Sequence, residues 1–217
     1  MANYFNPGCA LRLYKPRLAD RTLALLNERF GPVLPHETCC HHDPALPAGS
    51  VIINVCPGCD RRFRSLYEGI STVSLWEVLD GLDGLPLPDY DGLKLALHDA
   101  CPVRERPAIH NAVRGLLKKM NIGAVEPAQS GARSACCGDD FYGKLPLHEV
   151  HRLMKRRADS MPCRDVCVYC VSCVKSMAVG GRSPRHLIDL FYGEPTDPGD
   201  MDTGRWHEQL DEYISAH

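Results

Sequence analysis

The stretch LKLALHDACPVRERPAIHNAVRGLLKKMNIG (93–123) contains the unit from which the fold is predicted. Its first part, 93–101, alternates apolar side chains as a strand does and ends in a cysteine. Residues 104–120 have the apolar spacing of an amphipathic helix, and Gly123 is placed to end that helix. A strand followed by a helix, when repeated, builds a mostly parallel α/β sheet.

The same unit occurs earlier in the chain. The segments CALRLYKPRLADRTLALLNERFG (9–31) and CPVRERPAIHNAVRGLLKKMNIG (101–123) both run from a cysteine to a glycine, and Arg12 matches Arg104. A double cysteine, a C-x-x-C pair and a similar closing segment follow each of them, LWEVLDG (75–81) in one half and LIDLFYG (187–193) in the other. The chain therefore looks duplicated.

Further segments extend this pattern. Strands are predicted at 50–56 and 164–170, and helices at 17–30 and 146–159. We predict an α/β protein of two pseudo-repeated Rossmann-like cysteine-rich domains with mostly parallel sheets, at 1–82 and 92–195, that face each other across a cleft. The Gly-, Pro- and Asp-rich segment 82–92 is interpreted as a linker. Residues 196–217 are predicted to form a tail with a short amphipathic helix.

Composition narrows the class of protein. The 217 residues have a formal net charge of −2, which gives no global attraction to nucleic acid. The N-terminus does not resemble a signal peptide, and no apolar run is long enough to span a membrane. We therefore expect a soluble, cytoplasmic protein that binds no nucleic acid. In a reducing compartment, twelve cysteines indicate metal ligands or redox groups more than structural disulfides.

The arrangement of the cysteines indicates an unusual metal site. Neighbouring residues on a strand point to opposite faces, so two adjacent thiols serve one centre only where the backbone turns, as Gly138 permits after the second double cysteine. Zinc takes four ligands, whereas each half of the chain offers five cysteines. Because ligands gather at the carboxyl ends of parallel strands, each set is expected to converge there. The candidate ligands are Cys9, Cys39, Cys40, Cys56 and Cys59 in the first half, and Cys101, Cys136, Cys137, Cys170 and Cys173 in the second.

The second set carries a resemblance to a known family. The order Cys101, Cys136–Cys137–Gly138, Cys170 and Cys173, with 34 and 32 intervening residues, resembles the cysteine-rich CCG domain found in the disulfide-reducing component of heterodisulfide reductase and in its relatives. The resemblance implies that these cysteines hold a noncubane 4Fe-4S cluster. It also implies that a substrate disulfide is split by stepwise one-electron reduction.

The first set departs from this pattern. Only 15 residues separate Cys40 from Cys56, so a helix is expected to be missing, and His41 stands where the second half has glycine. One or two noncubane clusters are therefore expected, with zinc as an alternative at the first site. An electron-transfer or assembly subunit and a zinc-stabilised interaction module stay open as other functions.

Partners are expected because two motifs are absent from the sequence. There is no C-x2-C-x2-C-x3-C-P run for a cubane cluster and no G-x-G-x-x-G turn for a flavin or nicotinamide. The resemblance implies an iron–sulfur electron-transfer subunit, a flavin subunit that reduces it, and a small disulfide as substrate. The apolar stripe from Trp206 to Ile214 is a candidate docking patch, although packing on its own domain is the simpler interpretation.

Other polar residues have a functional and a structural interpretation. His98 and Asp99 are candidate proton donors or hydrogen-bonded structural groups. The basic segment 154–160 attracts an anionic substrate or simply faces water. For His41, His42 and Asp43, a solvated turn is favoured over a role at the first site. Cys163 and Cys167 lie outside the cysteine pattern, and Cys167 is interpreted as a buried apolar residue.

Overall fold

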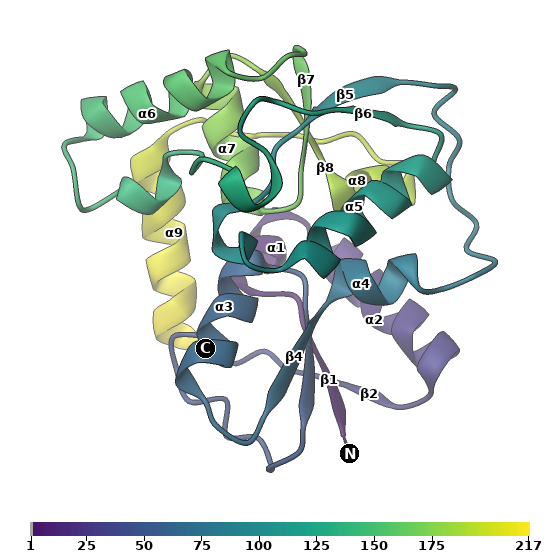
Figure 1. Ribbon diagram of the computed structural model, residues 1–217. Coiled ribbons are helices and arrows are strands. Elements are labelled where there is room, and N and C mark those ends of the chain that lie inside the picture. The colour runs from purple at the N-terminus through teal and green to yellow at the C-terminus, as the bar shows by residue number, and fades with distance from the viewer. Residues whose placement is uncertain (1) are drawn as a thin grey trace. The chain divides into compact units, whose positions relative to one another are not determined.

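The computed structural model describes residues 2–217, which divide into two compact units. The first unit comprises 1–78, with Met1 outside the description, together with 202–217, and the second comprises 79–201. Each unit is an α/β fold around one four-stranded, wholly parallel sheet, so the predicted fold class is confirmed. Figure 1 shows the elements of both units.

In the first unit the sheet has the order β2-β1-β3-β4. Its strands are β1 (Asn3–Asn6), β2 (Val33–Pro35), β3 (Val51–Asn54) and β4 (Ser71–Ser74). The helices are α1 (Cys9–Tyr14), α2 (Pro16–Phe30), α3 (Pro57–Leu66), α4 (Leu75–Asp80), whose last two residues belong to the second unit, and α9 (Thr203–Ala216).

The second unit repeats this topology with the order β6-β5-β7-β8. Its strands are β5 (Lys94–Leu97), β6 (Gly123–Val125), β7 (Asp165–Val168) and β8 (Ser183–His186). The α-helices are α5 (Pro107–Lys119), α6 (Leu147–Asp159), α7 (Val171–Val179) and α8 (Leu187–Tyr192). Three short 3-10 helices lie at Cys101–Val103, Gly131–Arg133 and Asp139–Phe141.

The duplication and its one large exception are visible in the order of elements. In both halves the chain moves from the first strand to the edge strand on one side and then returns to the other side, which creates a switch point between the two central strands. Helix α6 lies between β6 and β7 and packs on α7, and the described residues between β2 and β3 form no helix. The expected absence of a helix from the first half is therefore confirmed.

One helix end differs from the prediction. Helix α5 ends at Lys119, and Gly123 is the first residue of β6, so Gly123 does not end the helix. The chain leaves the helix through Asn121, which has a φ of 55°. Asparagine tolerates this left-handed conformation better than most residues do. The side chain of Asn121 also donates to Asp89 Oδ1 at 2.8 Å.

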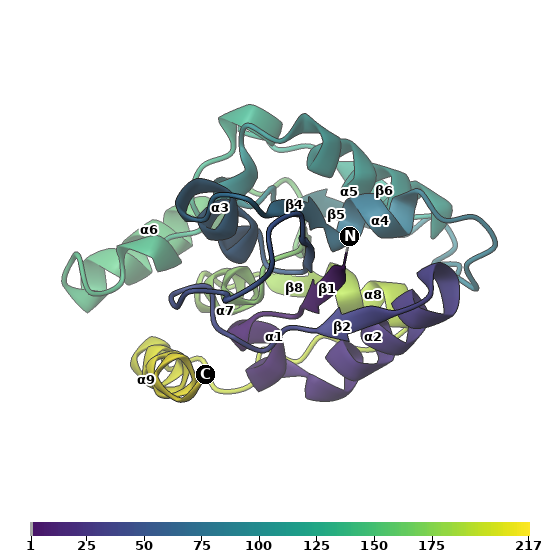
Figure 2. The same ribbon diagram turned by 90° about the horizontal axis from the view of Figure 1, so that it is seen from below.

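Two other segments have clear places in the fold. The predicted linker, 82–92, has no helix or strand and is held to the second unit by a hydrogen bond from the Tyr90 hydroxyl to the Leu190 carbonyl. The C-terminal segment ends in α9, which contacts α1 in the first unit (Figure 2). Among the helices within residues 2–217, none combines the length and the apolar character that crossing a membrane requires.

Candidate metal centres

The ten candidate cysteines lie in loops and helix starts that follow the strands. Cys9 and Cys101 follow β1 and β5, which are central strands of the two sheets. The double cysteines follow the edge strands β2 and β6, and the C-x-x-C pairs follow the other central strands, β3 and β7. Because all strands in a sheet are parallel, these positions lie together at the carboxyl ends of the strands, on both sides of the switch point.

The first set forms a continuous group of sulfurs. The Cys39 thiol is hydrogen-bonded to both Cys9 and Cys40, and Cys59 is hydrogen-bonded to both Cys40 and Cys56. The backbone at Gly8 has a φ of 77° and approaches this group closely. A Cβ atom added there would lie 3.3 Å from Cys59 Sγ, so only glycine suits the position.

The second set has the same connectivity. Cys136 is hydrogen-bonded to both Cys101 and Cys137, and Cys173 is hydrogen-bonded to both Cys137 and Cys170. None of the twelve cysteines of the described chain forms a disulfide. The structure thus brings each predicted set of five together, and it does so with the same contacts in both units.

In each set one thiol is favoured as the thiolate. Hydrogen bonds from Cys40 and Cys9 hold the pKa of Cys39 well below its usual value, and hydrogen bonds from Cys101 and Cys137 do the same for Cys136. The second member of each double cysteine has a raised pKa, about 12, because its thiol donates a hydrogen bond to the first member. Thiols held this close repel one another as thiolates, and a metal ion would relieve that repulsion.

The C-x-x-C pairs occupy the starts of helices. Cys56 is the N-cap residue of α3 and Cys170 is the N-cap residue of α7. The second cysteine of each pair, Cys59 or Cys173, lies in the first turn, where helical geometry brings residues three apart to the same face. The dipole at a helix start favours thiolates in general, but hydrogen bonds to the neighbouring thiols and burial raise the pKa of both Cys59 and Cys173 well above its usual value.

A buried carboxylate connects the three cysteine-bearing loops of the second unit. Asp99 accepts hydrogen bonds from Arg114 at 2.8 and 3.1 Å, from Gly131 N at 2.6 Å and from the Tyr169 hydroxyl at 3.1 Å. Its carbonyl accepts from Ser134 Oγ at 2.5 Å. Gly131 and Ser134 lie in the loop before the double cysteine, and Tyr169 directly precedes the C-x-x-C pair. The sequence left Asp99 as either a proton donor or a hydrogen-bonded structural group, and the structure shows the hydrogen-bonded arrangement.

His98 and Arg157 form a second buried pair beside the cysteines. A ring nitrogen of His98 lies with the sulfurs of Cys137 and Cys173 in a group whose atoms are all within 4.8 Å of one another, which makes a possible His/Cys/Cys metal site. His98 Nδ1 accepts a hydrogen bond from Arg157 Nε at 3.2 Å, so the neutral ring carries its hydrogen on Nε2. To bind a metal ion, His98 would have to lose that hydrogen or break the hydrogen bond to Arg157.

The remaining candidate residues lie in different surroundings. His41, His42 and Asp43 are exposed, and Asp43 Oδ1 accepts from the backbone of Ala45 at 2.8 Å. Cys167 is fully buried on β7, and burial raises the pKa of its thiol. Cys163 is half-buried and packs against the core cluster that contains Cys137 and Cys173.

The fold and the sulfur geometry together define a cysteine-rich α/β protein with a candidate metal centre in each of two similar units. Comparisons of the chain with protein-family models, with curated proteins and with solved structures gave no match.

Proposed function

We propose that the protein is an iron–sulfur redox subunit that binds a noncubane 4Fe-4S cluster at the second five-cysteine set and a related centre at the first. The observation that carries the proposal is that each unit assembles five thiols with the same connectivity. Four thiols satisfy a zinc ion or a conventional cluster, so a fifth indicates a larger or more open centre.

The reaction that we propose is the reduction of a small disulfide. One disulfide, two electrons and two protons give two thiols. A reduced iron–sulfur protein supplies the electrons one at a time, and the protons come from solvent. A bound cluster would store single electrons and offer iron positions with affinity for sulfur. The chain's own part in the second unit is to hold the five thiolates, through Asp99 and the start of α7, and to surround them with apolar side chains.

The partners follow from the same proposal. The sequence contains no motif for a nicotinamide, a flavin or a cubane cluster, so we propose an iron–sulfur electron-transfer subunit as electron donor, with a flavin subunit that reduces it in turn. The isolated chain with intact clusters should then reduce no disulfide with NADH or NADPH alone. It should do so when a dithionite-reduced viologen dye replaces the partner.

Metal analysis of anaerobically purified protein tests the cofactor directly. Two four-iron clusters give about eight iron and an equivalent amount of sulfide per chain. Iron at half that amount together with zinc would indicate that the first set holds zinc, a candidate favoured by its shorter connection between Cys40 and Cys56. Zinc at both sites without iron or sulfide contradicts the proposal and makes the protein a zinc-stabilised module.

A further inference from the structure

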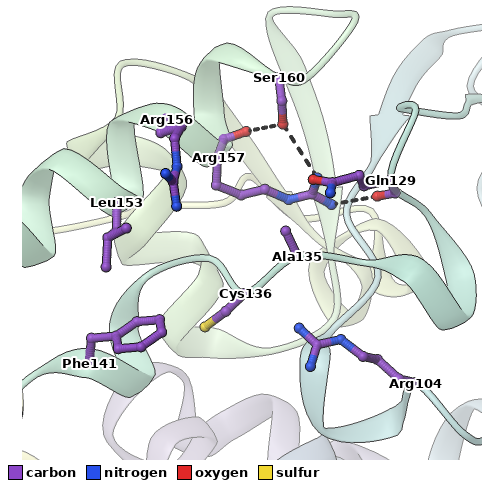
Figure 3. Close-up of a pocket in the computed structure, with 9 residues that line it drawn as sticks. All are labelled: Arg104, Gln129, Ala135, Cys136, Phe141, Leu153, Arg156, Arg157 and Ser160. Carbon is purple, nitrogen blue, oxygen red and sulfur yellow. Dashed lines mark hydrogen bonds between the residues drawn. The ribbon is translucent and has the colours of Figure 1, made fainter.

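A pocket of about 420 Å³ lies against the second cysteine set, within the second unit. Figure 3 shows the residues around it. Cys136, a member of the set, lines it together with the apolar side chains of Ala135, Phe141 and Leu153. The volume is in the range of pockets that bind small molecules. A molecule held here would therefore lie beside a metal-binding thiol.

The charged side chains of the pocket are all positive. Arg104, Arg156 and Arg157 line it, and none of its described lining residues is acidic. In Figure 3 the Arg156 side chain lies above the sulfur of Cys136 and the Arg104 side chain lies to its right. Guanidinium groups bind carboxylates and phosphates through paired, charge-assisted hydrogen bonds. The pocket therefore suits an anion.

The buried arginine is occupied by the protein itself. Arg157 is 3% exposed, and its donors go to His98, Ser160, Ser134 and the Gln129 carbonyl, which are all neutral acceptors. A buried charge needs a compensating charge nearby, and the thiolates of Cys137 and Cys173 together with the Asp99 carboxylate supply it for Arg157. Arg104 and Arg156, in contrast, are exposed to the open side of the pocket.

Comparison with the first unit shows that Arg104 has no acidic partner among the described residues. Arg12, at the matching position in the first unit, forms ion pairs with Asp20 and Glu37. Glu37 lies two residues before the first double cysteine, and the residue at that place in the second unit is Ser134. Arg104 Nε donates to the Ser134 carbonyl at 2.5 Å, and no carboxylate in the described chain pairs with the guanidinium. The second unit thus leaves uncompensated a charge that the first unit neutralises.

We infer that this pocket binds a small molecule that carries a carboxylate or another oxyanion, with Arg104 and Arg156 as its anchors. The inference rests on the proposed function for one point, that the molecule is a disulfide whose sulfur lies at the second set. Phe141 and Leu153 contact the short carbon chain between the oxyanion and the sulfur. The substrate class is therefore an acidic disulfide of low molecular mass.

Binding is tested with a probe that cannot be reduced. The thioether 3,3′-thiodipropionate is titrated into the metal-loaded protein by calorimetry, and inorganic phosphate is titrated separately. We expect Arg104→Gln and Arg156→Gln each to weaken binding about tenfold, which corresponds to about 1.4 kcal/mol. Arg152→Gln is the matched control, because Arg152 lies on the same helix, is 71% exposed and pairs with Glu149 outside the pocket. Tighter binding of the thioether than of phosphate indicates an organic acid, and the reverse order indicates a phosphorylated ligand.

Turnover with three disulfides of similar length separates this inference from the proposed function. The dianionic 3,3′-dithiodipropionate should have a higher kcat/KM than neutral 2-hydroxyethyl disulfide or cationic cystamine, and Arg156→Gln should remove the preference. If all three disulfides are reduced at rates that depend neither on their charge nor on the two arginines, the inferred anion-binding role of the pocket is wrong, but the proposed function stands. Arginine-dependent binding of the probe without any turnover leaves the pocket intact and contradicts the function. If neither anion binds the metal-loaded protein, the inference is wrong.

If Arg104→Gln loses iron, Arg156→Gln decides the question, because the Arg156 side chain is exposed on α6 and makes no hydrogen bond or ion pair within the described residues. Unchanged probe affinity in an iron-replete Arg156→Gln protein also overturns the inference.

Discussion

At the scale of single residues, one glycine distinguishes the two cysteine sets. Gly138, after the second double cysteine, has a φ of 109°, and a Cβ atom there would lie 2.7 Å from Met154 Cγ and 2.8 Å from Met154 N. Met154 belongs to α6. The first unit has no helix at the corresponding place, and it accommodates His41 after its double cysteine, with no positive φ. The glycine is therefore required by the close approach of α6, and not by the adjacent thiols themselves.

The substitution Gly138→Ala should destabilise the protein because α6 lies so close to this position. Overpacking against the α6 backbone and a strained φ should together lower the free energy of unfolding by about 3 kcal/mol. Gly143→Ala is the control, because Gly143 also has a positive φ but nothing lies within 4 Å of its added Cβ. That change should cost about 1 kcal/mol. Chemical denaturation of both variants measures the difference, and equal costs would show that α6 does not impose the glycine.

Asp99 predicts how the second unit responds to acid. Burial alone would raise the pKa of Asp99, but hydrogen bonds from Arg114 and Gly131 outweigh it, and the pKa is lowered overall. The unfolded chain has the ordinary, higher value, so the stabilisation is fully present above that value and is lost as the pH falls through the lowered folded pKa.

The substitution Asp99→Asn should therefore lower the free energy of unfolding by roughly 3 kcal/mol at neutral pH. This is near the lower end of the usual cost of breaking a buried ion pair, because Arg114 keeps Glu126 as a partner. The difference from the unaltered protein should shrink below about pH 4. Urea unfolding across pH 3–7 measures it. Glu126→Gln is the control, since Glu126 is 42% exposed, and should cost less than about 1 kcal/mol. A difference that does not change with pH would argue against an ionised Asp99.

At the scale of elements, α9 is the clearest case of a distant segment supporting a site. Ile214 packs against the core cluster that contains Cys39, Cys40 and Cys59. The His217 carbonyl accepts a hydrogen bond from Cys39 N at 3.1 Å, and the Ile214 carbonyl lies 2.7 Å from His42 Nε2. The helix at the end of the chain therefore covers the loop that carries the first double cysteine.

From this packing we expect Ile214→Ala to weaken the first centre selectively. The loss of a partly buried side chain should cost about 1–2 kcal/mol, somewhat less than at a fully buried site. Metal should leave the first set faster when the protein is challenged with a chelator, while the second set keeps its metal. Glu212→Ala, an exposed position on the same helix, should release metal at the unaltered rate. Equal release from both sets in Ile214→Ala would contradict the assignment of α9 to the first unit.

At the scale of the whole molecule, two units of the same topology each contain a complete five-cysteine set. Every contact in a set comes from residues of its own unit, so the two centres should be separable by mutation. Metal binding and folding are coupled where several loops supply the ligands. Loss of one centre should consequently destabilise one unit and leave the other folded.

The expected outcome is that Cys136→Ser removes the metal of the second set only and that Cys39→Ser removes that of the first only. Iron analysis and thermal unfolding, with one transition shifted in each variant, would measure this. Cys163→Ser is the control, because Cys163 packs against the core beside the second set but is not one of its five thiols. Unchanged iron content in both cysteine variants would falsify the assignment of these residues as ligands.

The sequence by itself determined the duplication, the strand–helix order and the membership of the two cysteine sets. These features are local or repeated. Apolar periodicity predicts each helix and strand. The repeat is indicated by cysteines in the same order in both halves: Cys9 or Cys101, then a double cysteine, then a C-x-x-C pair. The shorter connection after Cys40 also predicted that the first half lacks a helix, and the structure has α6 only in the second half. Gly123 was assigned wrongly, because asparagine at 121 already provides the left-handed turn.

Only the tertiary structure decided which polar groups surround the thiols. Asp99 and Gly131 are 32 residues apart in the chain, and Arg157 and His98 are 59 apart, so no local pattern relates them. The same holds for the pocket, where Arg104 follows β5 and Arg156 lies on α6. The sequence related the pocket to the first unit only through the match of Arg12 with Arg104. That match does not show that the charge of Arg12 is neutralised and that of Arg104 is not. Charge compensation depends on distances across the folded chain, and those distances exist only once the parallel strands have brought their carboxyl ends together.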